Sequence, residues 1–140
     1  MREAIAALAL VALANTALAC SCRVFTASEL FVDARAIFVG RVIQTSMHPH
    51  PSPPAGFKSG YERLRVQVRT IEAVKGEPVS NMEMNRHTEC GPHLKIGWDY
   101  LFLIRSNNSA DACSIWTTER IPGRLGNEML EKFRALKRPR

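Results

Sequence analysis

After its first nineteen residues the sequence has no apolar run long enough to cross a membrane, because the uninterrupted apolar stretch at residues 100–104 is only as long as a strand. It also has no nucleophile–base pair, no motif of paired carboxylates and no phosphate-binding loop, so we do not expect an enzyme. No nucleic-acid-binding motif is present, and no aromatic residues alternate with basic ones to stack on bases. These absences argue against membrane insertion, catalysis and nucleic-acid binding.

The charge balance is basic but gives no strong indication of a partner. The 140 residues contain 19 Lys and Arg against 13 Asp and Glu, a formal net charge of +6. The basic residues are scattered, and the only dense cluster is at residues 137–140. A solvated chain end is the simplest interpretation of this cluster, and a weak contact with a polyanion is the alternative.

The first nineteen residues have the pattern of a secretory signal peptide. Arg2 supplies the charged start, and an apolar core spans residues 4–14. Ala17 and Ala19 form the small-x-small pattern after which a signal peptidase cuts. We therefore expect a secreted protein, extracellular or periplasmic, from which residues 1–19 have been removed.

Cleavage there leaves Cys20 as the first residue of the mature chain. The mature part, residues 20–140, is long enough for one domain with a single core. An alternative is a lipid anchor on Cys20, which would acylate its α-amine. This alternative is disfavoured because such anchors usually have Leu three places before the cysteine, where this chain has Ala17.

All four cysteines, Cys20, Cys22, Cys90 and Cys113, lie in the mature part. An even number in an exported chain predicts disulfide bonds. A bond between Cys20 and Cys22 would close a small strained ring, so we expect one of them to pair with Cys90 and the other with Cys113. A four-thiolate zinc site is the alternative, but paired cysteines in such sites are usually separated by two or more residues. Here one residue separates Cys20 from Cys22, and the other two cysteines are isolated.

The remaining patterns predict two helices and five strands. Thr26 and Glu29 match a capping box at the start of a helix, and Gly40 indicates a bulge or a close backbone approach inside a strand. The expected elements are a helix at 27–34, strands at 37–43 and 64–69 with a bulge at 70–71, a turn at 75–78, strands around 82–84, at 100–104 and at 113–118, and an amphipathic helix at 126–137. Residues 47–61 are expected to form a loop.

Five short strands in a chain of this size predict a mainly β fold. We expect a closed five-stranded barrel of the oligonucleotide/oligosaccharide-binding (OB) type, with a short N-terminal helix and a C-terminal amphipathic helix. Such barrels have many functions, so the fold class alone does not define one.

Two groups of residues are candidate metal ligands that we reject. His48 and His50 stand one residue apart in the expected loop, where a polar hairpin tip is the simpler interpretation. His87, Cys90 and His93 are spaced by three, but the Gly-Pro pair at 91–92 argues against a helix that would bring them together.

The order of these segments resembles one known family. The segments are the Cys-x-Cys start at 20–22, the short helix, the strand at 37–41, Val-Lys-Gly at 74–76, Glu-Cys-Gly at 89–91, Tyr-Leu-Phe-Leu at 100–103 and Cys-Ser at 113–114. Together they resemble the inhibitory domain of the tissue inhibitors of metalloproteinases (TIMPs), within the netrin-like (NTR) group. The size resembles that of a bacterial, single-domain member.

The resemblance implies an inhibitor of secreted zinc metalloendopeptidases with no cofactor of its own. The α-amine and carbonyl oxygen of Cys20 would chelate the catalytic zinc of the protease. Ser21 would enter the pocket beside the zinc, and Cys22, Thr88 and Glu89 would complete the contact. The family's pairing implies disulfides Cys20–Cys90 and Cys22–Cys113.

This chain also departs from the family pattern. The family domain has a third disulfide, and no further cysteine is present here to form it; Val32 stands where one half would be. The alternative function is a netrin-like extracellular binding module that holds a partner protein or a polyanion without inhibiting a protease.

Overall fold

The computed structural model describes residues 22–52, 55, 61–87, 92–105, 110, 112–117 and 124–138. In these ranges the chain is mainly β, with five strands and two α-helices. In chain order the elements are α2 (Ala27–Asp33), β1 (Ala34–Pro49), β2 (Tyr61–Lys75), β3 (Asn81–His87), β4 (Asp99–Arg105), the 3-10 helix η2 (Ala112–Ser114), β5 (Ile115–Thr117) and α3 (Arg124–Lys137).

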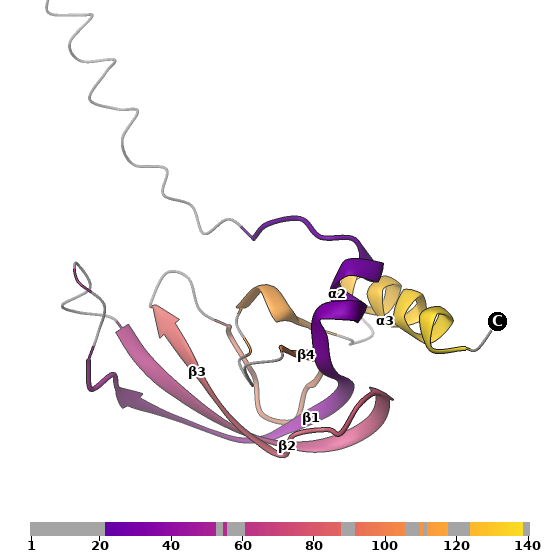
Figure 1. Ribbon diagram of the computed structural model, residues 1–140. Coiled ribbons are helices and arrows are strands. Elements are labelled where there is room, and N and C mark those ends of the chain that lie inside the picture. Colours follow the sequence, from indigo (N-terminus) through magenta and orange to yellow (C-terminus); the bar gives the residue numbers. More distant parts are fainter. Residues whose placement is uncertain are drawn as a thin grey trace, which may run out of the picture.

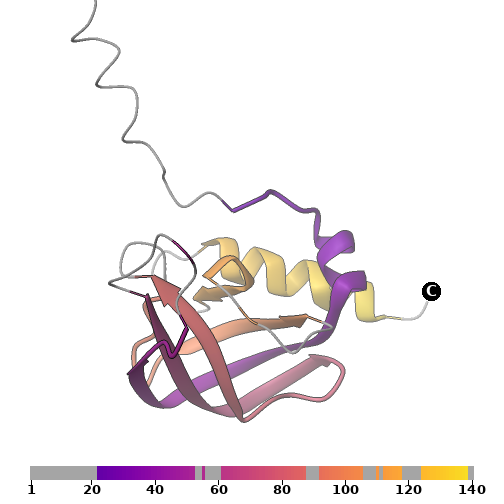
Figure 2. The ribbon, with the colours of Figure 1, turned by 60° about the vertical axis from the view of Figure 1, so that its left-hand side comes forward.

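The five strands form one antiparallel sheet in the order β3-β2-β1-β4-β5 (Figure 1). The sheet is strongly twisted, as Figure 2 shows. The closed barrel that we expected is not confirmed. Among the described residues, β3 and β5 each pair with one neighbour and lie at the two edges of an open sheet.

Strand β1 is the centre of the sheet and runs further than expected. Its first half, from Ala34 to Arg41, pairs with β4, and the part from Ile37 to Pro49 pairs with β2. The expected loop from residue 47 was therefore wrong at its start. Pro49 fits in the strand because β1 has no β4 partner there, and a proline is tolerated on an unpaired strand edge.

Bulges bend the β1–β2 pair. The register shifts between Val39 and Gly40, so Ile71 on β2 has no partner, which confirms the bulge expected at 70–71. A Cβ atom built on Gly40 would lie 2.2 Å from Cγ1 of the Val68 side chain and 3.5 Å from the carbonyl oxygen of Arg69. A larger residue at this position would require the Val68 side chain to shift.

The sheet separates two hydrophobic cores, because alternate residues of a strand point to opposite faces. Tyr100, Phe102 and Ile104 of β4 belong to the inner core, on the concave face, and the rings of Phe102 and Phe38 stack at 5.3 Å. Leu101 and Leu103 belong to the helix core, which α2 and α3 cover. The uninterrupted apolar run at 100–104 is therefore buried on both faces, as predicted.

Both helices lie side by side on one face of the sheet in both ribbon views (Figures 1 and 2). Leu130 and Phe133 of α3 are buried in the helix core, and the Phe133 ring lies 6.2 Å from that of Phe31 on α2. Lys137, from the basic C-terminal cluster, donates to the carbonyl oxygen of Ala73 at 3.0 Å. One residue of that cluster therefore helps to dock α3 on β2.

The last strand is shorter than expected. Cys113 and Ser114 lie in η2, and only residues 115–117 pair with β4. The expected strand at 113–118 was wrong at its start because the chain turns at Cys113, whose sulfur is bonded to Cys22.

Candidate functional site

The candidate site begins with an extended segment that precedes α2, residues 22–26, which we call the leading segment. It has no regular secondary structure and lies largely exposed, with Val24 94% exposed. The guanidinium of Arg23 lies 5.1 Å from the ring centre of Phe25. Phe25 packs against the helix core and so attaches the segment to the fold.

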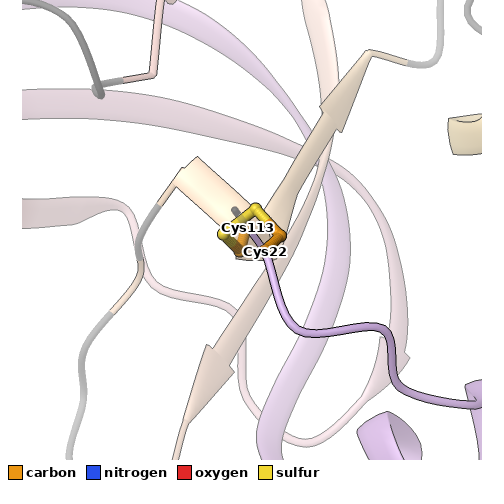
Figure 3. The surroundings of a disulfide bond; sticks show 2 residues. All are labelled: Cys22 and Cys113. Carbon is orange, nitrogen blue, oxygen red and sulfur yellow. A yellow bond between two sulfur atoms is a disulfide. The ribbon is translucent and has the colours of Figure 1, made fainter. Parts of the chain in front are cut away.

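A disulfide bond holds the other end of the leading segment. Cys22 is bonded to Cys113, with their Cα atoms 5.5 Å apart (Figure 3). Cys113 belongs to η2, which leads directly into β5. This bridge is one of the two pairings that the family resemblance implies, and the structure confirms it. It ties the start of the leading segment to the edge of the sheet, 91 residues further along the chain.

A capping box fixes the point where the leading segment enters α2. The backbone N–H of Glu29 donates to Oγ1 of Thr26 at 3.2 Å, and the backbone N–H of Thr26 donates to Oε2 of Glu29 at 2.7 Å. The hydrogen bonds from Thr26 are the main reason that the pKa of Glu29 lies below its ordinary value. The predicted cap is confirmed.

The C-terminal end of α2 is held by a residue that sequence reasoning placed only in a turn. Nζ of Lys75 donates to the carbonyl oxygens of Phe31 and Ala34, at 2.5 and 2.6 Å. A lysine at a helix C-terminus satisfies unpaired carbonyls and interacts favourably with the helix dipole. In the sequence, Lys75 stood out only as part of the Val-Lys-Gly motif at 74–76, and this motif did not indicate that Lys75 contacts α2.

Gly76 completes this attachment of α2 to the sheet. Its φ is +61°, a backbone conformation that favours glycine. A Cβ atom at this position would also lie 2.1 Å from the carbonyl oxygen of Arg35. The turn after β2 therefore fits directly against the start of β1.

The structure describes one of the predicted contact residues, Cys22. The other predicted residues, Cys20, Ser21, Thr88, Glu89 and Cys90, lie outside the described residues, as does the predicted signal peptide at 1–19. The Cys20–Cys90 bridge therefore stays a prediction. The last residue of β3, His87, pairs in register with Tyr61 of β2, and Thr88 and Glu89 follow it in the sequence.

The rejected histidines make local contacts in the structure. His48 lies on β1 and its Nε2 is 3.2 Å from the hydroxyl of Ser46. Nδ1 of His50 accepts from the backbone N–H of Ser52 at 3.1 Å. Within the part of the chain that the structure describes, no group of three His, Cys, Asp or Glu residues could hold a metal ion.

No protein-family model matches this chain, and no curated protein matches it either. None of the helices in the described ranges is long and apolar enough to span a bilayer.

Proposed function

We propose that the mature chain is a secreted inhibitor of zinc metalloendopeptidases, extracellular or periplasmic, that acts through the free N-terminus of Cys20 after removal of residues 1–19. One observation carries the proposal: the exposed leading segment is tied to the sheet by the Cys22–Cys113 bridge, two residues from the predicted N-terminus. A chain end held in this way can present its first residue in a fixed position.

The chemistry of an N-terminal residue suits this function. A catalytic zinc keeps one position open for water, and the α-amine and carbonyl oxygen of Cys20 can form a five-membered chelate there. The water that would attack the peptide bond is displaced, so hydrolysis stops. The amine must be neutral to bind, and since an α-amine titrates near pH ~7.7–8.0, binding should release a proton at neutral pH.

Fixing the chelating residue in advance reduces the entropic cost of binding. The leading segment has two attachments, the bridge at Cys22 and the capped helix that starts at Ala27. The proposed Cys20–Cys90 bridge would add a third, and would bring Thr88 and Glu89, which follow β3, beside the N-terminus. If the two edge strands, β3 and β5, approached each other, the sheet would form the expected OB-type barrel. Barrels of this type are themselves partly open.

A panel of secreted zinc endopeptidases tests this function. The oxidised chain that begins at Cys20 should inhibit at least one of them, and Ser21→Asp should weaken inhibition most, because a charge would enter the pocket beside the zinc. Ser21→Gly should weaken it unevenly across the panel. Val32→Ala, an exposed change on α2, is the matched control and should leave inhibition unaltered.

The alternative, a netrin-like binding module without a protease target, predicts no inhibition of any member of the panel. If Ser21→Asp inhibits every protease as well as the parent does, the proposed binding mode is wrong. Sequencing of the secreted protein should find Cys20 first and unmodified, and an acylated Cys20 would exclude zinc binding through its amine.

A further inference from the structure

A cavity opens beside the end of β1, the start of β2 and the end of β3. Its volume is about 310 Å³, and its walls include Thr45, Met47, Leu64, Arg86, Leu94 and Lys95. We call it the mouth cavity. Its size lies at the lower end of the range for small-molecule sites. Three strands and the segment before β4 contribute to it.

The pairing register of β1, β2 and β3 places the mouth cavity next to the end of the inner core. Met47, Leu64 and Met84 lie opposite one another across β1, β2 and β3, and Leu64 and Met84 are buried in the inner core. Arg86 is two residues further along β3 than Met84, so its side chain leaves the same face of the sheet. An arginine therefore stands where the apolar core ends.

Among the described residues, Arg86 has no acceptor suited to its charge. Its Nε atom is buried without a hydrogen-bond partner, and its Nη1 atom contacts Sδ of Met47 at 2.8 Å. A thioether sulfur is only a weak acceptor. Glu62 is its register partner on β2, yet among the described residues no carboxylate forms an ion pair with Arg86.

The part of the cavity wall that comes from the segment before β4 is held in place. The hydroxyl of Tyr100, a residue only 3% exposed, accepts from the backbone N–H of Lys95 at 2.9 Å. The ammonium of Lys95 lies 4.3 Å from the centre of the Trp98 ring. Leu94 packs against the inner core. The cavity therefore combines a fixed apolar wall with two cations.

A desolvated donor without an acceptor is unfavourable, and a charged one more so. A carboxylate can accept two parallel hydrogen bonds from a guanidinium, and the apolar wall suits a short hydrocarbon chain. We propose that the mouth cavity binds a small monocarboxylate with an apolar chain, paired with Arg86. The same group occurs in free short-chain acids and at the C-terminus of a peptide, so the experiment must separate these sources.

Isothermal titration of the whole mature protein with hexanoate tests the proposal. Hexanoate should bind, and hexan-1-ol, which has the chain without the charge, should bind at least about tenfold more weakly. Arg86→Gln should weaken hexanoate binding by at least about tenfold. The matched control is Arg63→Gln, because Arg63 pairs with Glu83 on the other face of the same strands and should change affinity less than about twofold.

Met47→Glu provides an independent test that does not remove the arginine. It places a tethered carboxylate where the sulfur now contacts Arg86, so it should raise the unfolding temperature and abolish hexanoate binding. The peptide Gly-Gly-Leu, as free acid and as C-terminal amide, then identifies the source. If Gly-Gly-Leu binds more tightly than hexanoate and its C-terminal amide does not bind, the natural ligand is a peptide C-terminus. If hexanoate binds more tightly than the peptide, the natural ligand is a free short-chain acid.

Three results would overturn the proposal. The parent could show no binding of either carboxylate at millimolar concentrations, Arg86→Gln could bind hexanoate as well as the parent does, or acetate and phosphate could bind as tightly as hexanoate. A parent that binds no carboxylate, together with an Arg86→Gln variant that unfolds at a much lower temperature, would show that the guanidinium already has its acceptor within the chain.

Discussion

Single residues far apart in the sequence attach the short helix α2 to the sheet. α2 has only seven residues, too few to be stable alone. Its N-terminus is satisfied by its own capping box, and its C-terminal carbonyls are satisfied by Lys75, more than forty residues away. Because the leading segment enters this helix, the orientation of that segment depends on these contacts.

Lys75→Met should lower the free energy of unfolding by about 1–3 kcal/mol, because the change removes a charged donor from partly buried carbonyls. Urea denaturation of the parent and the variant measures the difference. Lys132→Met, on the exposed side of α3, is the matched control and should change stability by less than about 0.5 kcal/mol. Equal losses in the two variants would show that the contacts of Lys75 contribute nothing specific.

At the scale of elements, α3 is docked by its apolar side, by the hydrogen bond of Lys137 and by an ion pair. Arg134 contacts Glu72 of β2 through both carboxylate oxygens, and the Nε–Oε1 distance is 2.9 Å. The hydrogen bond from Arg134 is the main reason that the pKa of Glu72 lies below its ordinary value. Both side chains are more than one third exposed, so the pair stabilises the fold by at most about 1 kcal/mol.

This pair predicts a pH dependence with a definite sign. The folded protein lowers the pKa of Glu72, so the stabilisation is complete above the ordinary carboxyl pKa of about 4.3 and is lost as the pH falls through the lower folded value. Thermal unfolding should therefore separate the parent from Glu72→Gln near neutral pH but not in strong acid. Glu77→Gln, an exposed change in the turn after β2, is the control. A difference that persists undiminished in strong acid would contradict this account of Glu72.

The leading segment depends on its disulfide bond. Replacing Cys22 and Cys113 together by alanine opens a loop of 91 residues, and the chain-entropy model gives an upper limit of about 4–5 kcal/mol for the loss of stability. Chemical denaturation measures this loss. The inhibition constant should worsen by more than the loss of stability explains, because the proposed chelating residue, Cys20, loses this attachment. A variant that stays folded and inhibits like the parent would show that the bridge has no role in presenting the N-terminus.

At the scale of the whole molecule, local sequence patterns predicted which helices and strands form better than they predicted the residues at which these elements begin and end. Thr26 and Glu29 were sufficient for the start of α2, because a capping box depends only on neighbours. The five apolar residues at 100–104 were sufficient for a strand buried on both faces. The extension of β1 to Pro49 was not predictable, because it depends on which edge of the strand is left without β4.

The candidate site was less accessible to sequence reasoning than the fold. The Cys22–Cys113 bridge followed from the family resemblance, whereas the residues alone left two pairings open. Two further features could be recognised only in the three-dimensional structure. One is the contact between Lys75 and the end of α2, and the other is the position of Arg86 at the end of the inner core. No periodic pattern marks either residue, since each depends on segments distant in the sequence.

The central claim is that the α-amine of Cys20 binds the zinc of a target protease. One alanine added before Cys20 covers that nitrogen while the Cys22–Cys113 bridge and both cores remain, so the unfolding temperature should change little. The decisive measurement is the inhibition constant of the parent and of this extended protein against the same zinc endopeptidase. We predict a loss of at least about a hundredfold, or ~2.7 kcal/mol. An extended protein that inhibits as strongly as the parent would contradict the claim.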